Sequence, residues 1–203
     1  MTMPTEPAQT DRIAELLLHI GRSARHEGAG SALTSAQWTC LRFFARANRS
    51  SCTPSAFASF QATTRGTASQ IIKGLEGRGL ILRRRDGSDG RSVRFELTAG
   101  GRAVLAGDPL QELAGAIAGF GAEERAALQG MLSRLAERLA EGRGAPAFGS
   151  CEDCIHFSDG PDGGRYCACM AATLEPEDLG QLCAHFSSGV GDDAESQTEE
   201  QSQ

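Results

Sequence analysis

The sequence lacks the features that would place the protein in a membrane or in one of several enzyme classes. Its 203 residues contain no apolar run of about eighteen residues, and residues 1–9 lack the basic start and apolar stretch of a secretory signal. A Gly-rich phosphate-binding loop, a Ser/His/Asp set and paired carboxylates are also missing. We therefore expect a cytoplasmic protein that is not an enzyme and has no membrane partner.

Aromatic residues are scarce at 5%, and 40% of the chain is hydrophobic, which at this length predicts one compact core with a small annex. The charge is distributed unevenly along the chain. Residues 61–102 hold nine Lys/Arg against four acidic residues, whereas residues 151–203 hold one Arg against twelve. The net charge of −6 therefore conceals a basic body with an acidic C-terminal part, and it predicts a polyanionic partner for the body.

Residues 11–141 show helical periodicity interrupted by one hairpin. Residues 11–26 form a first amphipathic pattern. A second helix is predicted to begin after Thr34, where Gln37 completes a capping box. Thr53-Pro54 predicts the start of a short third helix, and residues 65–75 form a fourth helix that Gly79 can end.

Extended chain follows this fourth helix. Residues 81–85 and 91–97 read as two extended runs around a Gly-rich turn at 86–90, and in the second run Val93, Phe95 and Leu97 alternate with polar residues, which predicts a hairpin. Thr98 then caps another helix, which is interrupted near residues 107–109. The last long helix spans residues 122–141 and carries one apolar stripe: Leu128, Met131, Leu132, Leu135 and Leu139.

Four motifs stand in a fixed order: Leu33-Thr-Ser-Ala-Gln-Trp38, Thr64-Arg-Gly-Thr-Ala-Ser69, Gly79-Leu80-Ile81, and Asp89-Gly-Arg91-Ser92 followed by Leu97-Thr98 and Gly101. Over residues 11–141 this order resembles the MarR family of bacterial transcriptional regulators, and the Asp-x-Arg wing leading to Leu-Thr is its most specific part. The resemblance implies a mainly α fold with a small β-hairpin wing, a winged helix-turn-helix with dimerisation helices. It further implies a homodimer in which the first and last helices interlock. This dimer is expected to bind double-stranded DNA, to repress transcription and to respond to a small-molecule or redox effector.

The predicted DNA-binding residues face outward from the fourth helix or lie at the wing: Thr64, Arg65, Thr67, Ser69, Gln70, Lys73 and Arg91. Arg65 and Gln70 can make bidentate base contacts, whereas the shorter side chains and Lys73 suit phosphates. By family analogy, Asp89 supports Arg91 and does not contact DNA. Taken singly, these residues could equally form a solvated surface, and their common order favours the DNA-binding interpretation.

Five of the seven cysteines lie between residues 151 and 183. Residues 142–150 are predicted to form a linker, residues 151–186 a small Cys/His-rich metal-binding module, and residues 187–203 a disordered acidic tail, after a flexible N-terminus at 1–10. Close cysteine pairs can share one tetrahedral ion. The expected ligands are Cys151, Cys154, Cys167 and Cys183, with Cys169, His156 and His185 as alternates.

Either zinc or an iron–sulfur cluster would suit such a thiolate set, and the sequence leaves this choice open. It also leaves open whether the module only stabilises the protein or senses metal and redox state. Minor candidates for effector or redox chemistry are His19, His26, Cys40 and Cys52. The competing functional hypothesis is a metal- or redox-handling interaction protein whose winged helix serves as a protein docking domain.

Overall fold

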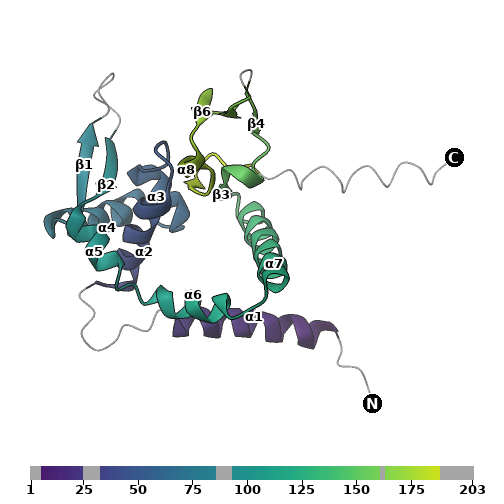
Figure 1. Cartoon of the computed structure of the whole chain (residues 1–203). Coiled ribbons are helices and arrows are strands. Elements are labelled where there is room, and N and C mark those ends of the chain that lie inside the picture. Colours follow the sequence, from purple (N-terminus) through teal and green to yellow (C-terminus); the bar gives the residue numbers. More distant parts are fainter. Residues whose placement is uncertain (1–5, 25–32, 86–92, 161–162, 188–203) are drawn as a thin grey trace, which may run out of the picture.

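The computed structural model describes residues 6–24, 33–85, 93–160 and 163–187. Its first part is helical and contains one hairpin (Figure 1). The elements in order are α1 Glu6–Ser23, α2 Ser35–Arg46, α3 Pro54–Phe60, α4 Arg65–Gly77, β1 Ile81–Arg85, β2 Val93–Leu97, α5 Ala99–Leu105, α6 Leu110–Ala118 and α7 Ala122–Glu141. No helix among the described residues is both long and apolar enough to cross a membrane.

Small strands and short helical turns make up the C-terminal part: β3 Gly149–Ser150, η1 Cys151–Asp153, β4 Phe157–Asp159, β5 Arg165–Cys167, β6 Ala172–Leu174, α8 Pro176–Leu179 and β7 Leu182–Cys183. All strand pairs are antiparallel: β1 with β2, β3 with β7, and β4–β5–β6 as a three-stranded sheet. We call residues 149–187 the cysteine module.

Local sequence signals set the helix ends of the first part. The Thr34 hydroxyl accepts the Gln37 amide at 3.3 Å and the Gln37 side chain accepts the Thr34 amide at 3.0 Å, which confirms the predicted capping box. Thr53 caps α3 with Pro54 in the first turn. Gly79 adopts φ +67° just after α4, a conformation that glycine adopts without a steric penalty.

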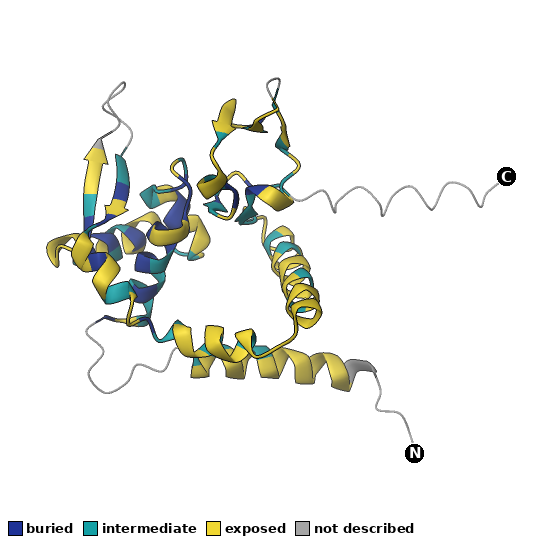
Figure 2. Cartoon of the chain, viewed as in Figure 1, coloured by how far each residue is buried: buried dark blue, intermediate teal, exposed yellow. Residues whose placement is uncertain are grey.

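The hydrophobic core lies entirely within residues 33–97 (Figure 2). It centres on the aromatic rings of Phe43, Phe44, Phe57 and Phe95, and Phe43 contacts the Phe57 ring at a centroid distance of 5.6 Å. Trp38 and Leu41 complete it from α2. This compact winged helix is the part of the chain that supports the exposed face of α4.

Outside the winged helix, α1, α6 and α7 contain no buried residue among those described. The apolar side chains of α1 and α7 are largely exposed, including Ile13 at 53%, Met131 at 53% and Leu139 at 51%, whereas Leu113 and Ile117 of α6 are half-buried. In Figure 1, α7 leads from α6 toward the cysteine module. Helices α1 and α7 therefore present unpartnered apolar stripes in the single chain.

Two boundaries differ from those predicted. Helix α1 begins at Glu6, within the segment 1–10 that was predicted to be a flexible N-terminus, and proline is tolerated in a first helical turn. Residues 142–150 are not a free linker either. Phe148 packs on Phe60 at a ring distance of 5.2 Å, and Gly149–Ser150 pair with β7, because an aromatic side chain at this point can reach the winged-helix core.

Candidate nucleic-acid interface and cysteine module

The N-terminus of α4 is capped and exposed. The Thr64 hydroxyl accepts the Thr67 backbone amide at 3.1 Å, and the two threonine hydroxyls lie 2.9 Å apart. Both residues were predicted to contact DNA, and the structure shows that their hydroxyls also serve the helix cap. The positive end of the α4 dipole is therefore held at the surface, where it favours an anion such as a phosphate.

The two faces of α4 differ as the sequence predicts. Ala68, Ile72 and Leu75 are buried in the core, and the opposite face is polar. Its exposed side chains include three of the predicted contact residues: Arg65, Gln70 and Lys73. Ser69 is half-buried, so it lies closer to the core than an outward residue would.

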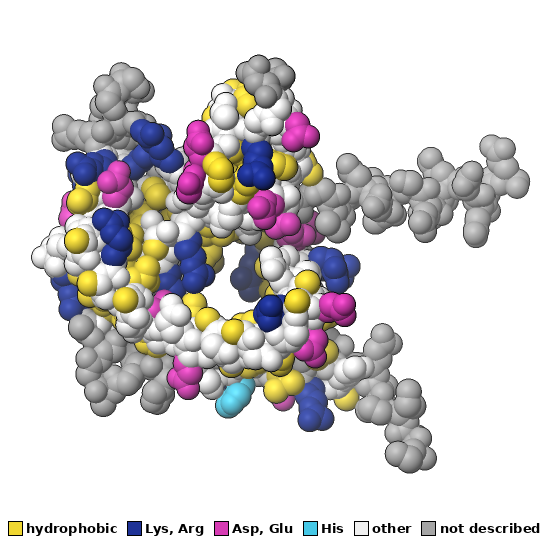
Figure 3. Space-filling view, viewed as in Figure 1, with side chains coloured by type: hydrophobic (Ala, Val, Ile, Leu, Met, Phe, Trp, Pro, Cys, Tyr) yellow, Lys and Arg dark blue, Asp and Glu magenta, His cyan; other side chains and the backbone are white. Residues whose placement is uncertain are grey.

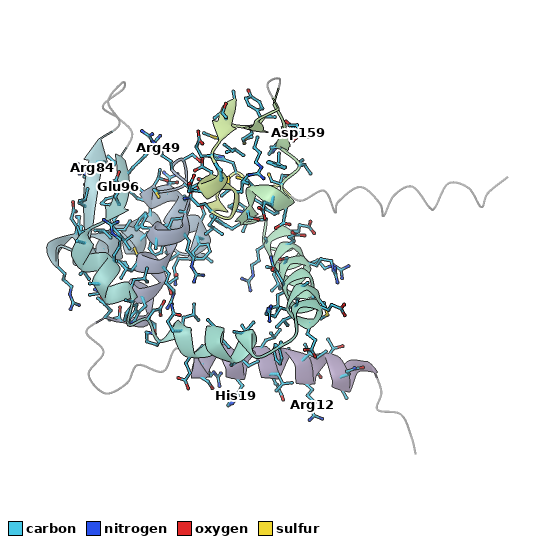
Figure 4. All side chains as sticks on the ribbon, viewed as in Figure 1. Arg12, His19, Arg49, Arg84, Glu96 and Asp159 are labelled. Atoms are coloured by element: carbon cyan, nitrogen blue, oxygen red, sulfur yellow. The ribbon has the colours of Figure 1, made fainter. Side chains whose placement is uncertain are left out.

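The wing is a regular antiparallel hairpin in which Ile81 pairs with Leu97 and Arg84 pairs with Arg94. The Arg84 guanidinium contacts the Glu96 carboxylate at 3.2 Å on the exposed side (Figure 4). The predicted tip residues Asp89 and Arg91 lie outside the described residues. The described strands thus form the base of the wing, and the roles of Asp89 and Arg91 at its tip stay predictions.

Figure 3 shows several Lys and Arg side chains over the winged helix and several Asp and Glu side chains over the cysteine module, with both signs on the helices below them. This agrees with the charge counts of the sequence, since residues 151–187 hold seven acidic residues against one Arg. The winged helix is therefore the part that attracts a polyanion.

Burial within the cysteine module differs among the predicted metal ligands and their alternates. Cys151, Cys167 and Cys183 are buried and Cys154 is half-buried. Of the alternates, Cys169 and His185 are exposed and His156 is half-buried. Three of the four expected ligands are therefore interior, and burial does not distinguish Cys154 from His156.

Cys151 lies close enough to the other three expected ligands to be influenced by their charges. The pKa of Cys151 is raised to about 11, chiefly by burial and in smaller part by the negative charges of Cys183, Cys167, Cys154 and Asp178. Among the described residues, however, no group of three or more His, Cys, Asp or Glu side chains is arranged as a metal site. The predicted metal therefore stays a prediction.

The sequence analysis missed the loop that joins the module to the winged helix, residues 47–53. The Asn48 amide donates to the Leu182 carbonyl at 2.9 Å, and the Ala184 amide donates to the Ser51 hydroxyl at 2.8 Å. Ser51 is fully buried, and the Asn48 side chain accepts its backbone amide at 2.9 Å. Short polar residues of this kind are ordinary in any loop, so no sequence signal distinguished these.

The same loop also contacts the wing. The Cys52 carbonyl accepts the Phe95 amide of β2 at 2.9 Å, and Thr53 caps α3. Leu182 and Ala184 of the module pack against the winged-helix core beside these bonds. Loop 47–53 therefore connects the cysteine module to both α3 and the wing.

The minor candidates separate by exposure. Cys40 is fully buried in the core, and burial raises its pKa far above the usual range for a thiol. Burial also raises the pKa of Cys52 to about 11, the Glu96 carboxylate adds to this shift, and Arg94 opposes it. His19 is exposed on α1 (Figure 4), and His26 lies outside the described residues. The two thiols are thus protonated and unreactive near neutral pH.

A pocket lies between α2, the start of α6 and the cysteine module. It has a volume of about 380 Å³ and is lined by Arg42, Arg46, Phe43 and Phe60 of the winged helix together with residues 180–182 of the module. Arg42 also forms an ion pair with Asp108 at 2.7 Å. Aromatic rings beside guanidinium groups suit a small aromatic anion.

Comparisons with known proteins agree with this geometry. The MarR family model matches residues 33–92. A MarR family protein from Bacillus stearothermophilus has a TM-score of 0.51 at 18% identity, covering 69% of this chain and 99% of its own. The S. aureus MepR–DNA complex has a TM-score of 0.50 at 20% identity, covering 66% and 96%.

The transcriptional regulator SlyA also has a TM-score of 0.50, at 23% identity, and the match covers 64% of this chain and 95% of that one. At these identities the likenesses show the fold, a winged helix with flanking helices. A search of the curated proteins gives no match to the chain.

Proposed function

The chain carries a MarR family domain at residues 33–92 and has the fold of this family's transcriptional regulators, and from this premise we propose that it binds operator DNA as a homodimer and represses transcription. The observation that carries the proposal is the exposed polar face of α4, which is capped at its N-terminus and supported by a buried apolar face. A helix presented in this way can enter a major groove with its first turn toward base edges and phosphates.

Arg65 and Gln70 are the proposed base-reading residues, and Lys73 is the proposed phosphate contact, because a guanidinium and an amide can each make two hydrogen bonds to one base. The S. aureus MepR–DNA complex is one example of this fold bound to DNA. The cysteine module adds a stabilising or sensing part to this regulator. The proposed place for a small effector is the pocket beside Arg46, with a small aromatic anion as the expected class.

A homodimer is proposed because the exposed stripes of α1 and α7 need a partner of matching shape. Leu135 and Leu139 lie on the same face of α7, and a second copy of the chain presents the same stripe. Light scattering after size exclusion should give twice the 21.4 kDa chain mass. Leu135→Asp should give monomers, whereas the control Ser133→Asp, on the opposite face of α7, should stay dimeric.

Selection from random duplexes by the full-length protein tests DNA binding. A dimer should select a two-fold sequence whose half-sites lie about one helical turn apart. Arg65→Ala should weaken binding to that sequence by about 1–3 kcal/mol, whereas Arg165→Ala, which removes an exposed charge from the cysteine module, should leave it unchanged. Selection of no sequence, or equal effects of the two variants, would refute specific binding through α4.

Salt dependence separates the competing hypothesis of a protein docking domain. Phosphate contacts release counterions, so the affinity for DNA should fall steeply as salt is raised, and Lys73→Ala should reduce the slope by about one. A docking domain for proteins predicts weak DNA binding with little salt dependence.

A further inference from the structure

The interior of the cysteine module contains little hydrocarbon. Its buried side chains, among the described residues, are Cys151, Cys167, Leu179, Cys183 and Phe186. A segment of this size with only two large buried apolar side chains cannot be stabilised by hydrophobic burial alone. All the cysteines are free thiols, so disulfides do not supply the missing stability.

Backbone pairing places the cysteines at neighbouring element ends. Strand β3 pairs Gly149 with Cys183, and Cys151 follows directly in η1. The Cys154 carbonyl accepts the Phe157 amide, and Phe157 pairs with Cys167 across β4 and β5. Segments far apart in the sequence therefore present their thiols to a common interior.

The surroundings of the sulfur atoms favour a bound cation. Three of the four expected ligands, Cys151, Cys167 and Cys183, are buried in this common interior. The His185 backbone amide donates to the Cys183 sulfur at 3.3 Å, an interaction that stabilises a metal-bound thiolate.

We propose that the module binds one Zn²⁺ through four thiolates: Cys151, Cys154, Cys167 and Cys183. Each thiol gives up its proton on binding, so one zinc ion and four thiols yield a complex of charge −2 and four protons in solution. Binding must turn the four sulfur atoms toward one point, since they do not form a ligand shell in the present arrangement. A zinc site of this kind is complete with the ion and the four cysteine ligands, whereas an iron–sulfur cluster also requires inorganic sulfide.

The zinc site also has a regulatory consequence, which rests on the proposed DNA-binding function. Strand β7 carries Cys183, and its Leu182 carbonyl accepts the Asn48 amide, while Ala184, the residue after β7, donates its amide to the Ser51 hydroxyl. That loop holds Phe95 of the wing through the Cys52 carbonyl. Loss of zinc should therefore loosen β7, then loop 47–53 and the base of the wing, and weaken DNA binding.

Metal analysis of the full-length protein, purified without chelators, tests the site. We expect one zinc per chain and no iron or sulfide. Brown protein with iron and sulfide would overturn zinc, and metal-free protein that binds no added Zn²⁺ would overturn the site. Titration of the metal-free wild-type protein with Co²⁺ should produce the visible absorption bands of tetrahedral thiolate coordination. This measurement requires no variant, so it does not depend on whether a variant folds.

Alkylation followed by mass spectrometry identifies the ligands in the native protein. Zinc should protect the four proposed cysteines until a chelator is added, while Cys169 reacts throughout. Cys169→Ser should keep its zinc and Cys183→Ser should lose it. Protection of Cys169, or zinc loss in the Cys169 variant, would overturn this ligand set.

DNA binding before and after chelation tests the connection to the wing. Zinc removal should weaken operator binding about tenfold, within the usual range of coupling between two sites, and re-addition should restore it. Hydrogen exchange should accelerate at loop 47–53 and β2, with no change in α4. Unchanged affinity and exchange in zinc-free protein would overturn the coupling and leave the DNA-binding proposal intact, whereas zinc-loaded protein without DNA binding would refute the proposed function alone.

Discussion

Gly101 of α5 is the position where a single added methyl group should disrupt the contact between α5 and the wing. A Cβ atom there would lie 2.0 Å from the Leu80 carbonyl oxygen and 3.0 Å from the carbonyl carbon. Both groups are backbone, so neither can rotate away. The same carbonyl accepts the Thr98 amide at 3.0 Å, which ties the start of α5 to β1.

To restore an ordinary contact, α5 must move away from Leu80 by more than about 1 Å. Overpacking of this kind costs roughly 1–3 kcal/mol, and a backbone clash belongs at the upper end. Weakening the Thr98 hydrogen bond adds about 1 kcal/mol. Gly101→Ala should therefore destabilise the protein by about 3–4 kcal/mol, which for a chain of this size lowers the melting temperature by roughly 10 °C.

Gly100→Ala is the matched control on the same helix. Its Cβ would lie 3.5 Å from the Thr98 hydroxyl oxygen and 3.8 Å from the Gly79 carbonyl oxygen, which are ordinary contacts. Alanine also has the better helix propensity, so this variant should gain about 0.5–1 kcal/mol. Thermal unfolding followed by far-UV circular dichroism compares the two. Equal melting temperatures would refute the close approach of α5 to β1.

Two further predictions concern buried groups. Asp108→Asn should destabilise the protein by about 2 kcal/mol, because it removes the ion pair with Arg42 and keeps an oxygen that accepts the Leu110 amide. Urea unfolding of this variant, of Arg42→Met and of the double variant should show that the two losses of stability are not additive. At about pH 8, iodoacetamide should label exposed Cys169 quickly and Cys52 slowly, because a pKa of about 11 leaves roughly a thousandth of Cys52 as thiolate. Labelling of Cys52 should then rise about tenfold per pH unit up to that pKa, and a rate that levels off near pH 9.0 would contradict the raised pKa of this half-buried thiol.

Local signals made much of the winged helix predictable. The capping box at Thr34, the proline start at Pro54, the left-handed Gly79 and the span of α7 all depend on residues within a few positions of one another. Side-chain periodicity likewise identified which face of α4 is exposed. Such features need no knowledge of the rest of the chain, and the structure confirms them.

The docking of the cysteine module was not predictable for the opposite reason. Ala184 and Ser51 are far apart in the sequence, and their bond joins an unremarkable amide to an unremarkable hydroxyl. Phe148 lies in a Gly- and Ala-rich stretch, so composition suggested a linker, although its ring fits against Phe43 and Phe60. Tertiary packing decided these contacts, and a single sequence carries no pattern for them.

The distribution of burial implies that dilution of the proposed homodimer unfolds the dimerisation helices and leaves the winged-helix core folded. The winged-helix core, with Trp38, is complete within one chain, whereas α1, α6 and α7 bury no described side chain until a partner covers them. Helices without tertiary contacts are only marginally stable in water, and dimer stability depends on protein concentration. On dilution, far-UV helicity should therefore fall before the fluorescence of Trp38, the single tryptophan of the chain, shifts toward that of an exposed indole. If both signals instead change together, or neither depends on concentration over a hundredfold range, the dimer does not stabilise these helices.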